Sequence, residues 1–294
     1  MAIRLTLDIY SGRANPQIIV GGAQERDLLC RVIPGRALGL HERSEAPVSI
    51  LGYRGLTVEQ LGRPALGLPK CFRVANGDLI GDGLHHRTTD EHFEEFVCGS
   101  TGPFQALGSG PRFFDRLQRE IEGYAELRER WRDKRHPWPT RELARCAPPD
   151  ERAWWNDPER VSSNNSYNYA ANYRTDDFAQ PGLGAGVNHN STCPQVVAAA
   201  VADGLLDSSA ANNHSPDEGH LVALVVTPGW DYHWYRKGRN GYWTHKPGDK
   251  PVTNVDNRGE LITDPRTAAR GGYTQFCTFM VVKHGHIKLA GTQA

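Results

Sequence analysis

The sequence has no excess of charge of either sign. Its 294 residues include 34 Lys and Arg against 34 Asp and Glu, which gives a formal net charge of zero with the twelve His neutral. General nucleic-acid-binding proteins present a strongly positive surface. The balance therefore excludes that class, and we predict no nucleic-acid partner.

Long hydrophobic runs are also lacking. No apolar stretch approaches the roughly 18 residues that a membrane-spanning helix needs, so we expect no membrane association. The first residues, MAIRLTLDIYSGR, alternate apolar and polar side chains and lack the apolar centre and cleavage site of a secretory signal. The sequence thus favours a cytoplasmic protein, with non-classical export left open.

Closely spaced cysteines are absent as well. The six Cys are widely and irregularly spaced, at positions 30, 71, 98, 146, 193 and 277. This spacing contains no CxxC metal pair and does not resemble the dense framework of a small secreted domain. We expect mostly reduced thiols, no metal and no cofactor.

A metal site is one alternative, because several His and acidic residues cluster in the first half of the chain. Their spacing matches no known metal site, and a polar surface loop is the competing interpretation. The residues concerned are His85, His86 and His92, with Asp82, Asp90 and Glu91.

Short strands and one long helix are predicted for the first half. The strand candidates are Ile3 to Ile9, Val48 to Tyr53, and Lys70 to Val74 before an Asn76-Gly77 turn. From Pro111 to about Asp133, apolar residues recur every three or four positions, as in an amphipathic helix. We therefore predict a β-rich accessory domain over 1–110, then an amphipathic helix and linker over 111–145.

The second half, 146–294, is predicted to be an α+β domain. Helix candidates follow Asn165 and Pro194. Strand candidates then succeed one another, which favours helices packed on a mostly antiparallel sheet. These strands are Leu221 to Val226, Tyr232 to Lys237, Tyr242 to His245 and Phe276 to Val282.

The segment VSSNNSYNYAANYR, residues 161–174, places poor helix formers where a helix should begin. If Asn165 is the N-cap, Ser166 is the first helical residue, at the positive end of the helix dipole. That position suits a nucleophile. A polar capping loop explains the same residues equally well.

The segment GWDYHWYRKGRNGYWTHKPG, residues 229–248, predicts a hairpin with two histidines. A three-residue loop with Gly241 in the left-handed region pairs Tyr235 with His245 and puts His233 and His245 on one face. A two-residue loop would put them on opposite faces. Two exposed histidines in a Trp-rich hairpin are the alternative without a function.

A nucleophile at a helix start, a His on a following strand and a third polar residue on the next strand occur here in that order. This order resembles the papain-like superfamily, particularly its NlpC-type amidohydrolase branch, over about residues 150–285. The resemblance implies a papain-like fold in which Ser166 is the nucleophile, His233 the general base and His245 the orienting third member. Asn254 or Asp256 are substitutes for that third member. It also implies an oxyanion hole from the Ser166 backbone N–H and the side chain of Asn164 or Asn165.

The resembled family has Cys where this sequence has Ser166. A hydroxyl needs a better aligned base than a thiol does. Three explanations compete: a Cys-to-Ser variant, a naturally inactive relative, and a true serine hydrolase. We favour the first, an inactivated form. Cys193, before Pro194 at another helix start, is the alternative nucleophile.

The predicted function is therefore a thiol-type hydrolase or acyltransferase acting on an amide bond of a peptide or protein substrate. Its cleft would be lined by aromatic side chains: Tyr167, Tyr169, Trp230, Trp234 and Trp243. The alternative is an inactive papain-like scaffold that binds a peptide or protein without cutting it. The sequence does not indicate an oligomeric state.

Overall fold

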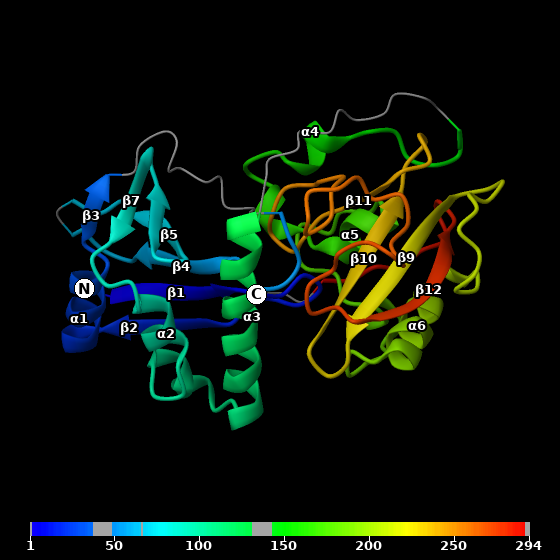
Figure 1. The fold of residues 1–294 in the computed structure, drawn as a ribbon. Helices are drawn as coiled ribbons and strands as arrows, with labels where there is room; N and C mark the ends of the chain where they lie inside the picture. Colours follow the sequence, from blue (N-terminus) through cyan, green and yellow to red (C-terminus); the bar gives the residue numbers. More distant parts are fainter. Residues whose placement is uncertain (1, 38–48, 66, 131–142, 292–294) are drawn as a thin grey trace. The chain divides into compact units, whose positions relative to one another are not determined.

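The computed structural model describes residues 2–37, 49–65, 67–130 and 143–291, and these fall into two compact units (Figure 1). The first contains residues 2–9, 15–37 and 53–130, and the second contains residues 10–14, 49–52 and 143–291. This division differs from the predicted boundaries in two ways. The long helix belongs to the first unit, and two short segments of the first half belong to the second.

The first unit is built on a seven-stranded antiparallel sheet in the order β2-β1-β4-β5-β6-β7-β3. The tight turn between β5 and β6 uses Asn76 and Gly77, both with positive φ, as the Asn-Gly pair predicts. The strands are β1 (Ala2–Asp8), β2 (Gln17–Gly21), β3 (Pro34–Ala37), β4 (Gly55–Gln60), β5 (Cys71–Ala75), β6 (Asp78–Gly81) and β7 (Leu84–Thr88).

The predicted amphipathic helix is α3 (Pro111–Arg130), and it buries Phe114, Leu117 and Tyr124. These positions are three or seven residues apart, so they share one face of the helix. The predicted end near Asp133 lies outside the described residues. The other helices of this unit are α1 (Gly22–Arg31), α2 (Phe93–Cys98) and the 3₁₀ turn η1 (Pro103–Leu107).

The second unit has a five-stranded antiparallel sheet in the order β11-β10-β9-β12-β8. Its strands are β8 (Leu206–Asp207), β9 (His220–Thr227), β10 (Asp231–Lys237), β11 (Trp243–His245) and β12 (Gln275–Val282). The helices are α4 (Arg152–Trp155), α5 (Ser166–Ala171) and α6 (Cys193–Ala202), with 3₁₀ turns η2 (Val161–Ser163) and η3 (Leu183–Ala185). The α+β class of the prediction is confirmed.

The sheet of the second unit has an apolar core on each face. On one face, Tyr167 of α5 and Val196 of α6 pack with Leu224 and Trp234 of the sheet. On the other face, side chains from β9, β10 and β12 pack with residues from the connecting segments. This second cluster includes Leu51, Ala223, Tyr235, Ile262 and Phe279.

The predicted strand over Val48 to Tyr53 is wrong, because residues 49–53 form no strand in the structure. The backbone N–H of Leu51 donates to the side-chain oxygen of Asn257, and the Asn257 amide donates back to the Leu51 carbonyl, both at 2.9 Å. A side chain distant in the sequence thus occupies the backbone groups that a neighbouring strand would use.

Candidate functional site

Helix α5 begins where the sequence predicts. The Asn165 side chain accepts hydrogen bonds from the N–H groups of Tyr167 and Asn168, and the Asn168 side chain accepts from the Asn165 N–H. This reciprocal capping box makes Ser166 the first helical residue. Ser166 is completely buried, and its Oγ has no hydrogen-bond partner among the described residues.

The predicted register of the His233 hairpin is confirmed. Tyr235 pairs with His245, and the Gly238 N–H donates to the Tyr242 carbonyl at 2.9 Å, which closes a three-residue loop. Gly241 has a φ of 81°, the left-handed conformation that this loop requires. His233 and His245 therefore share a face.

The two histidines are hydrogen-bonded to each other, with His233 Nε2 3.0 Å from His245 Nδ1. His245 Nε2 lies 3.0 Å from the Val255 carbonyl, which can only accept, so this nitrogen carries a proton. Burial lowers the pKa of His245 to about 4, despite the opposing effect of the Val255 carbonyl, so the ring is neutral near pH 7. Its Nδ1 then accepts the proton that His233 donates from Nε2.

The structure brings the two histidines together but gives Ser166 no hydrogen bond to either. Helix α5 packs through Tyr167 on Trp234, with ring centroids 5.2 Å apart. Side chains alternate along a strand, so the neighbouring His233 projects toward the other face, where its ring lies 6.0 Å from that of Tyr273. All three predicted triad residues are at most 1% exposed.

The predicted substitutes for the third triad member have other roles. Asp256 accepts hydrogen bonds from the N–H groups of Arg258, Glu260 and Ala269, which shapes a turn. Asn254 is buried, and its backbone carbonyl accepts a hydrogen bond from the Ile262 N–H. His245 bonds the carbonyl of the residue between them, Val255, instead of either side chain.

The predicted oxyanion-hole amides also have protein partners. The Asn165 amide donates to the carbonyls of Gly12 and Ala179, each at 2.8 Å. The Asn164 amide donates to Asp176 Oδ1 at 3.1 Å. Both side chains thus hold the loops around α5 in place.

Most of the predicted cleft aromatics are core residues instead. A large ring that lines a cleft keeps part of its surface in solvent, so a ring that is almost completely buried belongs to the core. Trp230 is half-buried, and its ring packs against Tyr10 at 5.3 Å. The other four are at most 2% exposed: Tyr167, Tyr169, Trp234 and Trp243.

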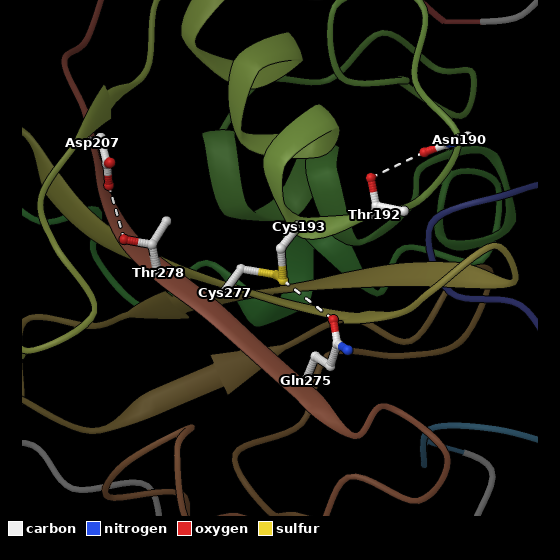
Figure 2. The surroundings of a disulfide bond; sticks show 7 residues. All are labelled: Asn190, Thr192, Cys193, Asp207, Gln275, Cys277 and Thr278. Carbon is white, nitrogen blue, oxygen red and sulfur yellow. Dashed lines mark hydrogen bonds between the residues drawn. A yellow bond between two sulfur atoms is a disulfide. The ribbon is translucent and has the colours of Figure 1, made fainter.

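The alternative nucleophile, Cys193, is joined to Cys277 in a disulfide, so its sulfur is not available as a thiolate (Figure 2). The bond ties the first residue of α6 to β12, with the two Cα atoms 5.3 Å apart. The expectation of reduced thiols fails for this pair. Free thiols remain at Cys30, Cys71, Cys98 and Cys146.

The histidines of the first unit do not converge on a metal site. His85 lies 3.3 Å from Asp78, whereas His92 lies 3.0 Å from Glu95. Within residues 2–37, 49–65, 67–130 and 143–291, no group of three or more His, Cys, Asp or Glu is arranged to hold a metal ion.

Sequence reasoning missed the importance of the segment 10–14. The Gly12 carbonyl accepts from the Asn165 amide, from the Gln180 amide at 2.9 Å and from the Tyr232 hydroxyl at 2.9 Å. A Cβ on Gly12 would lie 2.4 Å from the Tyr232 ring, so this position requires glycine. The pattern SGRANP predicts a turn but does not indicate which distant residues the turn contacts.

Asp231 anchors the same segment. Its carboxylate accepts from the N–H groups of Ser11 and Gly12 and from the Tyr273 hydroxyl. Burial raises the pKa of Asp231 to about 6, although these donors oppose the shift. The carboxylate therefore depends on hydrogen-bond donors, the Tyr232 backbone among them, to remain charged inside the protein.

The fold and these contacts define a two-unit α+β protein with a disulfide in its second unit. No family model matches the chain, and no solved structure matches it. The chain is 44% identical over 131 residues to insoluble matrix shell protein 1 of Ruditapes philippinarum, a match that covers 44% of this chain and 85% of that protein. The chain belongs to the family of that shell protein. No described helix is long and apolar enough to cross a membrane.

Proposed function

We propose that this chain is a secreted, non-catalytic protein of an insoluble extracellular matrix. Its second unit would be a papain-like scaffold that holds a partner without cleaving it. The observation that carries this proposal is the burial of Ser166, whose Oγ lacks any hydrogen-bond partner among the described residues. A hydroxyl nucleophile needs a base within hydrogen-bond reach and a path to substrate.

Two further findings support a matrix location. Disulfides persist in oxidising compartments such as the extracellular space, so the Cys193–Cys277 bond removes the argument for a cytoplasmic protein that rested on reduced thiols. The name of the related protein also places that protein in a shell matrix. Together they favour export over the cytoplasm.

A second candidate function is the thiol-type hydrolase or acyltransferase that the sequence predicts. The specific observation in its favour is the His233–His245 pair, in which the Val255 carbonyl fixes the proton positions. This arrangement places a proton on His233 Nε2, so in the neutral ring Nδ1 is the nitrogen that can accept a proton. Ser166 also begins helix α5, as the nucleophile of that family does.

The proposal predicts that Ser166 is chemically silent. A fluorophosphonate probe should not label the wild-type protein. Ser166→Ala should leave the free energy of unfolding unchanged or raise it by up to about 1 kcal/mol, because it removes a buried hydroxyl that has no partner. Ser163→Ala is the matched control, since the Ser163 hydroxyl donates to the Arg160 carbonyl and its loss should cost about 1 kcal/mol. Stoichiometric probe labelling that Ser166→Ala abolishes would contradict the proposal.

A further inference from the structure

An open groove of about 460 Å³ lies in the second unit, next to the disulfide-bonded start of α6. Among its described lining residues, Arg13 is the one with a cationic side chain, and amide and hydroxyl groups come from Gln180, Asn188, Asn190 and Thr192. Neither Asp nor Glu occurs among the described lining residues. As far as the structure describes its lining, the groove is thus polar, with one fixed positive charge and no carboxylate.

Arg13 is held in place before any ligand binds. One of its Nη atoms donates to the Trp230 carbonyl at 2.7 Å, and its guanidinium carbon lies 4.8 Å from the centre of the Tyr10 ring. The side chain is exposed, and a guanidinium has five N–H donors, most of which these contacts leave unused. A guanidinium fixed in this way matches the geometry of a carboxylate or sulfate.

His189 provides a neutral donor in the same groove. Its Nδ1 accepts from the Ser191 N–H at 3.2 Å, so the proton of the neutral ring is on Nε2. Burial, followed by the charge of Arg13, lowers the pKa of His189. At neutral pH this side chain therefore adds a hydrogen-bond donor without adding charge.

The start of α6 adds a second feature that favours an anion. Thr192 is the N-cap, but its hydroxyl donates to the Asn190 side chain at 3.0 Å instead of accepting from the helix (Figure 2). The N-terminal backbone of this ten-residue helix consequently has no side-chain cap, and its dipole is positive at the groove.

We propose that this groove binds an anionic sugar unit of a polysaccharide. Its carboxylate or sulfate would pair with Arg13, and its hydroxyls would bond the amides of Asn188 and Asn190. The apolar side chains of Leu183 and Val187 would contact the C–H face of the ring. The inference rests on the proposed matrix function and names its partner, but it does not depend on whether Ser166 reacts.

Binding of fluorescent oligouronate and sulfated dextran oligosaccharides to the full chain tests this inference, with uncharged dextran of the same length as the control ligand. Arg13→Gln should weaken binding at least tenfold. Arg258→Gln removes another exposed charge, from outside the groove, and should have no effect. Asn188→Ala changes an exposed side chain of the groove and should weaken binding about threefold with the fold intact.

Three results would overturn the inference: no binding by the wild-type chain, equal binding by Arg13→Gln and wild type, or a poly-aspartate peptide that competes as well as the oligouronate. The last result would mean an acidic-peptide site. Because Ser166 is not among the described residues that line this groove, sugar binding and probe labelling are separate measurements, and the groove and the non-catalytic assignment can fail separately.

Discussion

Replacing Cys193 and Cys277 together with Ser is expected to lower the free energy of unfolding of the second unit by about 4 to 5 kcal/mol. The disulfide closes a loop between residues 84 apart in sequence. Such a cross-link restricts the unfolded chain, and the loss of conformational entropy grows with the logarithm of loop length. A long loop therefore makes this bond a large contributor to stability.

Urea unfolding followed by Trp fluorescence measures the effect, because Trp154, Trp155, Trp230, Trp234 and Trp243 all lie in the second unit. Cys146→Ser is the control, since Cys146 is free and exposed and its replacement should change little. Reduction of the wild type should reproduce the double variant. A double variant within 1 kcal/mol of wild type would show that the bond does not stabilise this unit.

Acid is expected to destabilise the second unit, by roughly 4 kcal/mol between pH 7 and pH 4. Burial lowers the pKa of His220 to about 3 and that of His245 to about 4. The His220 Nε2 lies 2.7 Å from the Ala170 carbonyl, and its Nδ1 is buried without a hydrogen-bond partner. In the unfolded chain both rings take up a proton near pH 6.5, so the unfolded state gains stability as the pH falls below that value.

Asp231 opposes this effect. Its folded pKa of about 6 lies above the ordinary value of 3.8, so the folded state binds a proton more tightly between these values. Its contribution therefore stabilises the fold as the pH falls from 7 to 4, by about 2 kcal/mol, against roughly 3 kcal/mol lost at each histidine. The histidines together outweigh the carboxyl group.

Urea unfolding at pH 7, 5 and 4 tests both predicted effects of acid: the destabilisation through the histidines and the stabilisation through Asp231. His220→Gln retains a donor for the Ala170 carbonyl but cannot titrate, so its stability should fall less with acid than that of wild type. The free energy of unfolding of Asp231→Asn should fall more steeply with acid than that of wild type, because the stabilising contribution of the Asp231 carboxyl group is lost. A flat wild-type profile, or identical slopes in all three proteins, would contradict the assigned pKa directions.

The features that depend on local sequence were predictable. The capping residues around Asn165 specify the start of α5, and the length of the loop at Gly241 fixes the register that pairs Tyr235 with His245. In each case the physical cause lies within a few residues of the feature.

The features that depend on distant partners were not predictable. Leu51 joins the second unit through Asn257, and Gly12 does so through the side chains of Gln180 and Tyr232. The disulfide also depends on a distant partner, because cysteine spacing alone does not reveal which cysteines pair. Burial also depends on the whole fold, which is why aromatic side chains predicted to line a cleft are core residues.

The central claim, that position 166 is not a working nucleophile, is tested most directly with Ser166→Cys. The rate of alkylation by iodoacetamide at position 166 would be compared with that at Cys146 in the same protein from pH 5 to pH 9, with sites assigned by peptide mass spectrometry. We predict slower reaction at position 166 at every pH, because the site is buried, and no dependence on His233. Faster reaction at position 166 below pH 7, lost in His233→Ala, would contradict the account and establish the thiol-type hydrolase.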